Sequence, residues 1–112
     1  MKTKQRVTEF EQQVYEICSK VPKGSVTSYK KIAHAMRTKA YRAVGAALKN
    51  NPYAPKVPCH RVVASDGTLG GFQGSTNIKG KALKKKLLML TEEGVEIEKG
   101  KIKEFEKICF TF

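Results

Sequence analysis

Hydrophobic residues recur at helical spacing near the start of the chain. Between residues 8 and 20 they fall on one face of a helix, at Phe10, Val14, Ile17 and Cys18. Thr8 and Glu11 have the spacing of a capping box, in which each side chain bonds the backbone N–H of the other residue. The pattern predicts a helix over residues 8–20 that packs one face on a core.

Two shorter helices are predicted next. Ser28 can cap a helix from Tyr29 to about Met36, and a break at residues 37–38 separates it from a helix over about residues 39–50. The apolar stripe of the last helix is Val44 and Leu48, and most of its other surface is very small: Ala43, Gly45, Ala46 and Ala47. Two short helices joined by a tight turn suggest a helix-turn-helix.

The middle of the chain alternates between loops and a short β-like run. Prolines keep residues 51–58 out of a helix, and residues 61–64 have the pattern of a strand that a turn at residues 65–67 closes. Residues 69–77 form a loop rich in glycine and small polar residues.

A last long helix is predicted over residues 79–93, with Leu83, Leu87 and Leu90 facing inward and Gly94 ending it. Residues 95–103 then suggest a small hairpin. We therefore expect one mainly α domain over residues 1–112, winged-helix-like, with a helix-turn-helix and short β segments.

The charge of the chain points to a polyanionic partner. Lys and Arg number 22 against 10 Asp and Glu, a net charge of +12. Nucleic acid is the first candidate, although a merely lysine-rich surface gives the same number. No stretch approaches the ~20 apolar residues of a membrane span, and no apolar run follows the basic N-terminus. We expect an intracellular protein with no membrane contact, in the cytoplasm or nucleoid, or in the nucleus of a eukaryote.

The cysteine pattern excludes the usual scaffolds. Three cysteines, an odd number, argue against a complete disulfide framework, and their spacing fits no zinc pattern. Cys18 and Cys109 lie among apolar neighbours, so we interpret both as small core residues. We expect no metal site.

Cys59 differs because His60 follows it. Cysteine reacts as the thiolate and needs a base or a positive field to form it. Adjacent side chains often point apart, so a relay water fits between them, and a carboxylate behind His60, for which Glu93 is the candidate, would orient the ring. A buried cysteine beside a surface histidine is the ordinary alternative for a bare Cys-His pair.

The segment Pro58-Cys59-His60-Arg61-Val62 resembles the active-site signature of the O6-alkylguanine-DNA alkyltransferases. Other motifs of that family match in order between about Phe10 and Ile97. They are residues 26–29 with Ile32-Ala33 at the start of the helix-turn-helix, residues 42–47 in its recognition helix, Asn51-Pro52 leading to the active site, residues 70–74 in the pocket loop, and residues 86–90 with Glu93-Gly94 in the last helix. Together they are specific enough to identify the chain as similar to the family's C-terminal catalytic domain.

The resemblance implies a reaction and its catalytic residues. Cys59 would accept the alkyl group, His60 would act as the base through water, Glu93 would polarise His60, and Asn51 would brace the active-site turn. Sulfur would displace guanine at the alkyl carbon, and the thioether would not hydrolyse, so each molecule would act once without a cofactor.

The resemblance also implies the residues that bind the substrate. Tyr29 would donate to guanine N3, and backbone carbonyls near Cys59 and Val62 would bind the exocyclic amine. The backbone N–H of Gln73 would contact O6, and Phe72 and Lys86 would lie near the pocket.

The implied partner is double-stranded DNA with a flipped alkylguanine, bound by a monomer through the minor groove. Arg42 would replace the rotated-out base. The rest of the groove surface would consist of Tyr41, Ala43, Gly45, Ala46 and Ala47.

The sequence departs from the family pattern in three places. Long members carry an N-terminal domain, some with zinc, and we expect this chain to lack it. Phe72 stands where tyrosine is usual, and Tyr41 stands where a small residue is common. These changes bear on alkyl-size preference and groove fit more than on the reaction.

Two other functions fit part of the pattern. Non-catalytic alkyltransferase-like proteins are also short and bind alkylated DNA, but usually carry tryptophan in place of the acceptor cysteine; this chain has Cys59 and no tryptophan. A helix-turn-helix regulator with a redox cysteine explains the charge and Cys59, but not the other motifs together.

Overall fold

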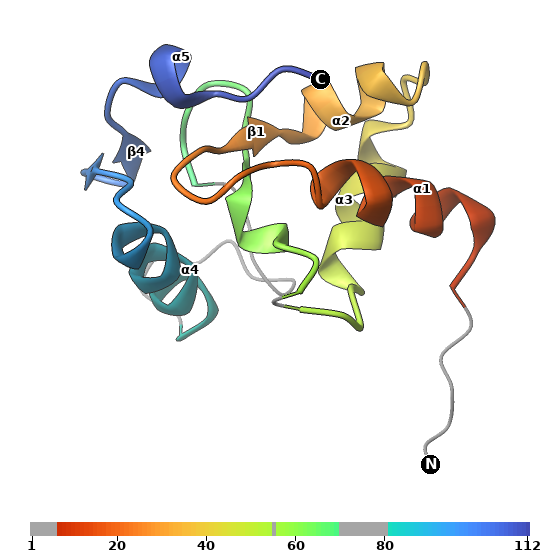
Figure 1. The fold of residues 1–112 in the computed structure, drawn as a ribbon, viewed down its shortest axis with the longest axis horizontal. Coiled ribbons are helices and arrows are strands. Elements are labelled where there is room, and N and C mark those ends of the chain that lie inside the picture. The colour runs from red at the N-terminus through yellow and green to blue at the C-terminus, as the bar shows by residue number, and fades with distance from the viewer. Residues whose placement is uncertain (1–6, 55, 70–80) are drawn as a thin grey trace.

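The computed structural model describes residues 7–54, 56–69 and 81–112, with Phe72 and Gln73 of the expected pocket loop outside that part. The chain runs through short helices and two-residue strands (Figure 1). In order they are α1 (Glu9–Cys18), β1 (Thr27–Ser28), α2 (Tyr29–Ala35), α3 (Tyr41–Lys49), the 3-10 turn η1 (Cys59–Arg61), β2 (Val62–Val63), α4 (Lys81–Glu92), β3 (Ile97–Glu98), β4 (Lys101–Ile102) and α5 (Phe105–Ile108). The expected mainly helical class with short β segments is confirmed.

The first two helices begin at the predicted caps. Thr8 and Glu11 form a reciprocal capping box on α1, and the Ser28 side chain accepts from the backbone N–H of Lys31 at the start of α2. The turn between α2 and α3 is fixed by Arg37 in the left-handed region, at φ 59°, and by the Thr38 hydroxyl, which accepts from Ala40 N. These contacts set α2 and α3 as the helix-turn-helix.

A parallel pair of strands joins the two sides of the molecule. Thr27 of β1 pairs with Val62 of β2, and Ser28 with Val63. Helices α1–α3 lie on one side of this pair, and α4, β3–β4 and α5 lie on the other (Figure 1). One apolar cluster includes Val14, Ile32, Val44 and Val62, and a second includes Val26, Val63 and Leu90. The strands therefore run between the two cores.

The inward face of α4 differs from the predicted one. Leu83 and Leu90 are buried, but Leu87 is 38% exposed, so the expectation for Leu87 was wrong. Lys86 is fully buried in its place, because the helical phase that buries Leu83 and Leu90 turns residue 86 inward. Periodicity that counts only apolar residues cannot find an inward lysine.

The C-terminal segment adds structure that the sequence did not indicate. Cys109 is only half-buried, which corrects its interpretation as a core residue, and it forms a parallel bridge with Val26. Phe110 N donates to Val26 O at 2.6 Å, and the Thr27 hydroxyl donates to Phe110 O at 3.0 Å. The tail thus covers the edge of β1 that β2 leaves open.

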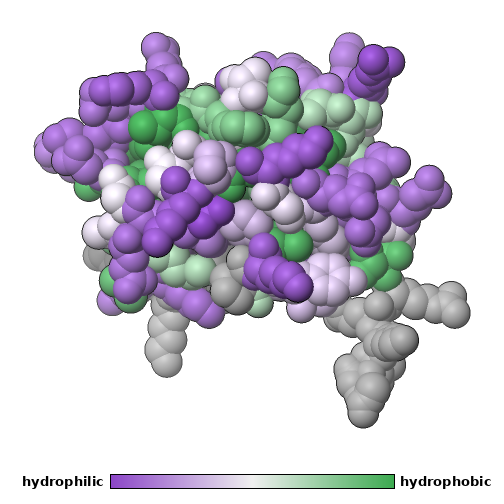
Figure 2. All heavy atoms as spheres, viewed as in Figure 1, coloured by the Kyte–Doolittle hydropathy of each residue, from purple (hydrophilic) through white to green (hydrophobic). Residues whose placement is uncertain are grey.

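The surface is strongly polar where it is described. Hydrophilic side chains cover much of the face in Figure 2, with hydrophobic patches between them. Within the described ranges, no helix has the length and apolar character to cross a membrane.

A buried hydrogen bond joins α1 to α3, and its loss should be measurable. The Tyr15 hydroxyl donates to Ala47 O at 2.7 Å, satisfying a carbonyl in the last turn of α3. Tyr15→Phe keeps the ring but leaves this carbonyl without the donor. We expect the free energy of unfolding in urea to fall by ~1 kcal/mol. An unchanged midpoint and slope would show that the bond does not stabilise the packing.

Candidate active site

Cys59 begins a tight turn that the preceding loop holds in place. Asn51 Nδ2 donates to Val57 O, and Asn51 Oδ1 accepts from Tyr53 N, both at 2.9 Å. Cys59 N in turn donates to Val57 O at 2.8 Å. One amide side chain therefore ties both ends of the loop that leads to Cys59, whose residue surface is only 9% exposed.

Glu93 lies directly after α4 and receives hydrogen bonds from both residues that follow Cys59. His60 Nε2 lies 2.9 Å from Glu93 Oε2. Arg61 donates through Nε to Oε1 at 2.9 Å and through Nη2 to Oε2 at 2.7 Å, a two-pronged pair. Arg61 Nη1 also donates to Val21 O at 2.8 Å, so the network reaches the turn after α1.

This network fixes the proton on His60. Burial alone would raise the pKa of Glu93, but hydrogen bonds from Arg61 and His60, and their positive charge, outweigh it and hold the pKa below its usual value. Glu93 is therefore a carboxylate, which can only accept, so His60 Nε2 carries the hydrogen. In the neutral ring Nδ1 is then the acceptor; it is buried and has no hydrogen-bond partner among the described residues.

Lys86 brings a cationic group to the same region. Its Nζ donates to Val62 O at 2.7 Å and to Leu69 O at 2.6 Å. Burial lowers the pKa of Lys86 to about 7, against the opposing effect of negative charge at Cys59. The Val62 carbonyl, expected to bind the guanine amine, is thus already an acceptor for Lys86.

The surroundings of Cys59 are apolar. Cys59 belongs to the same core cluster as Cys18, and Tyr29 packs against that cluster. Burial raises the pKa of Cys18 and of Tyr29 to about 12, and a thiolate at Cys59 adds to both effects when it forms. Both groups keep their protons near neutral pH, so Tyr29 can serve as a hydrogen-bond donor there.

The exposed face of α3 carries most of the residues expected to bind DNA. Tyr41, Arg42, Ala43 and Ala46 are exposed, and Gly45 is half-buried. Ala47 is buried and does not belong to this face, because the helical phase that buries Val44 and Leu48 includes it.

Comparison of the sequence with known protein families identifies the family of the chain. Residues 9–95 match the family described as "6-O-methylguanine DNA methyltransferase, DNA binding domain". The chain belongs to this family. The matched range contains Cys59, His60 and Glu93 together with both helices of the helix-turn-helix.

Named relatives of the methyltransferase family resemble the chain over most of its length. The methylated-DNA–protein-cysteine methyltransferase of Methanothermobacter thermautotrophicus is 41% identical over 91 residues, which are 81% of this chain and 47% of that protein. The protein of the same name from Thermococcus kodakarensis is 46% identical over 91 residues, which are 80% of this chain and 47% of that protein. The chain thus spans about half the length of these curated relatives.

Two kinds of solved structure resemble the fold of the chain. Mycobacterium tuberculosis OGT in complex with DNA has a TM-score of 0.68 and 37% identity, over 79% of this chain and 51% of that one. S. pombe Atl1 in complex with damaged DNA containing O6-carboxymethylguanine has a TM-score of 0.78 and 30% identity, over 96% of this chain and 100% of that one.

Arg61 is the residue of this candidate site that sequence reasoning missed. It stands inside the Pro-Cys-His-Arg motif but received no role, because nothing in the sequence shows that Glu93 pairs with it. One signal was available: Glu93 was expected behind His60, and Arg61 follows His60 directly, so Arg61 could have been expected to pair with Glu93. Among the residues that the structure describes, no group of three or more His, Cys, Asp or Glu side chains could hold a metal ion.

The buried lysine gives a pH-dependent prediction. Because the folded pKa of about 7 lies below the unfolded value of ~10.4, the unfolded chain binds more protons between these pH values. The Lys86 contribution to the free energy of unfolding therefore rises with pH across this window. Urea unfolding from about pH 7 to about pH 9 should show wild type gaining stability relative to Lys86→Met. The exposed neighbour, changed as Lys85→Met, is the control; a pH-independent difference for Lys86→Met would contradict the prediction.

Proposed function

We propose that this chain repairs double-stranded DNA by moving an alkyl group from O6 of guanine to its own Cys59, once per molecule. The observation that carries the proposal is the arrangement of Cys59, His60 and Glu93 within the matched range. Formation of a thiolate at Cys59 requires a nearby base. His60 is adjacent in sequence, and Glu93 fixes which of its ring nitrogens can accept the proton.

The proton and electron movements balance without a cofactor. The Cys59 thiol gives its proton, through a water, to His60 Nδ1, and Glu93 stabilises the imidazolium. Sulfur then bonds to the alkyl carbon, the carbon–O6 bond breaks, and its electron pair goes to the guanine. Tyr29, which keeps its proton, donates to guanine N3, so part of the charge on the leaving base is stabilised.

The α3 surface suits a duplex that must be opened. O6 lies inside the stacked helix, so the damaged nucleotide has to rotate out. We propose that α3 enters the minor groove as part of a monomer, with Arg42 filling the gap and small side chains at Ala43 and Ala46 allowing close approach. The net charge of +12 supports contact with the phosphates.

A second candidate is lesion binding without transfer. S. pombe Atl1 is 30% identical to the chain and has a TM-score of 0.78 over 96% of it. Cys59 argues against this candidate, because a protein that only binds needs no activated nucleophile. The two candidates differ in whether the lesion is lost from the DNA.

Replacing the nucleophile separates binding from chemistry. We expect Cys59→Ser to bind a duplex that contains O6-methylguanine about as tightly as wild type, but to leave the lesion in place. The measurement is labelled methyl transfer from the duplex under single-turnover conditions, with affinity measured in parallel. Cys18→Ser is the matched control, and transfer that persists in Cys59→Ser would overturn the assignment.

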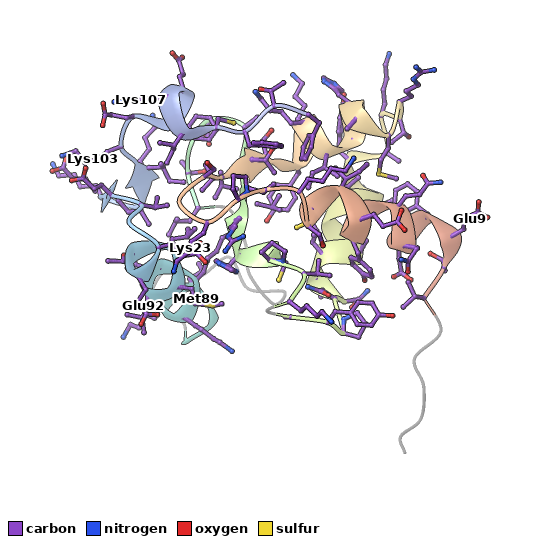
Figure 3. The ribbon with its side chains drawn as sticks, viewed as in Figure 1. Glu9, Lys23, Met89, Glu92, Lys103 and Lys107 are labelled. Atoms are coloured by element: carbon purple, nitrogen blue, oxygen red, sulfur yellow. The ribbon has the colours of Figure 1, made fainter. Side chains whose placement is uncertain are left out.

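The carboxylate behind the base should control the rate. Glu93→Gln cannot stabilise an imidazolium as a carboxylate does, so the single-turnover rate should fall by something like the ~10²–10⁴ of general base catalysis. DNA affinity should change little. Glu92→Gln, at the exposed last residue of α4 labelled in Figure 3, is the matched control. An unaltered rate in Glu93→Gln removes this residue from the mechanism.

Gly45 gives a test of the groove surface. A Cβ added at Gly45 would meet nothing within 4 Å, so no packing inside the protein requires glycine there. Gly45→Ala should raise the free energy of unfolding by ~0.5–1 kcal/mol, because glycine is a poor helix former. It should nevertheless slow repair in a duplex more than reaction with free O6-benzylguanine. If Gly45→Ala is more stable and repairs both substrates at the wild-type rates, DNA does not approach this position.

A further inference from the structure

Tyr41 is held against the first helix of the helix-turn-helix. Its hydroxyl lies 3.3 Å from His34 Nε2, and the two rings meet edge to face with centroids 6.1 Å apart. Tyr41 is the first residue of α3 and is 38% exposed. The ring is therefore partly covered and tethered on the α2 side, with its remaining surface open.

The helical phase of α3 places this ring at one border of the exposed face. Successive residues turn by about 100°, so Tyr41 and Gly45 share a side one turn apart. Arg42 and Ala46 occupy the middle of the face, and Ala43 lies at the other border. The residues one turn along from Arg42 on this face, Gly45 and Ala46, are small, and Tyr41 lies beside α2. The next large exposed side chain on this face is Lys49, two turns from Arg42.

We propose that Tyr41 is a specificity-determining residue, which packs on the deoxyribose of one wall of the minor groove and sets the groove width that α3 accepts. This inference rests on the proposed function, in which α3 enters that groove with Arg42 in its middle. The contact with His34 holds the ring in place beside α2, so the wall of the groove has to accommodate it.

As a consequence, DNA affinity and the transfer rate should depend on the sequence that flanks the lesion. The minor groove of B-DNA is only about 6 Å wide, and A-tracts narrow it further and resist deformation. A fixed ring at the border of α3 should therefore disfavour lesions flanked by A-tracts relative to lesions flanked by mixed sequence. Removing the ring should weaken this discrimination.

The experiment compares two duplexes that carry the same O6-methylguanine, one flanked by A-tracts and one by mixed sequence. The readouts are the affinity by fluorescence anisotropy and the single-turnover transfer rate, each expressed as a ratio between the duplexes. A folding defect lowers both members of a ratio, so the ratio reports on groove fit. We expect wild type to favour the mixed duplex by about threefold or more.

The variants separate the ring from its tether. Tyr41→Ala should bring the ratio close to one, and Tyr41→Phe, which keeps the ring, should retain most of the discrimination. His34→Ala frees the ring and should give an intermediate ratio. Phe112→Ala, which removes a 40% exposed ring from the C-terminal tail, should leave the ratio at the wild-type value.

The outcomes distinguish this inference from the proposed function. If wild type binds the lesion but transfers nothing, the alkyl-transfer proposal fails, while the affinity ratio still tests Tyr41. If wild type transfers normally and Tyr41→Ala has the wild-type ratio, the inference about Tyr41 is overturned. A ratio near one in wild type itself overturns it as well.

Discussion

The shared carboxylate of Glu93 is the constraint on which the site depends. It accepts from His60 and twice from Arg61, and Arg61 also reaches the carbonyl of Val21. One side chain at the end of α4 thereby connects the active-site turn with the turn after α1. The positive charge of Arg61 keeps Glu93 ionised, and ionised Glu93 leaves His60 Nδ1 as the acceptor. Removing either charge would leave its partner partly buried without the opposite charge, which lowers stability less than the loss of a fully buried pair would.

The backbone around Cys59 is held from three directions. Asn51 ties the loop before it, Lys86 binds the Val62 carbonyl just after it, and β1 pairs with β2 beside it. The buried lysine is unusual because an ammonium group loses its hydration in the interior, where the carbonyls of Val62 and Leu69 accept from it. Its position on α4 couples the long helix to the strand that follows the nucleophile.

Much of the fold and site could be predicted because it depends on local signals. The caps at Thr8 and Ser28, the small surface of α3 and the Pro-Cys-His-Arg motif are all visible within a few residues. The rest depends on contacts between distant segments. The pairing of β1 with β2 joins runs of two residues, and the C-terminal tail joins Val26 through backbone atoms, so neither leaves a side-chain pattern. Leu87 and Ala47 were misplaced because polarity and size alone do not fix the phase of a helix.

The central claim is that Cys59 itself receives the alkyl group. The most direct test is the intact mass of the wild-type chain after incubation with an equimolar duplex that contains one O6-methylguanine. We predict that nearly every molecule gains the mass of one methylene group, that the gain maps to the peptide with Cys59, and that the DNA then carries guanine. An unchanged mass with the duplex still bound and still methylated would contradict the claim.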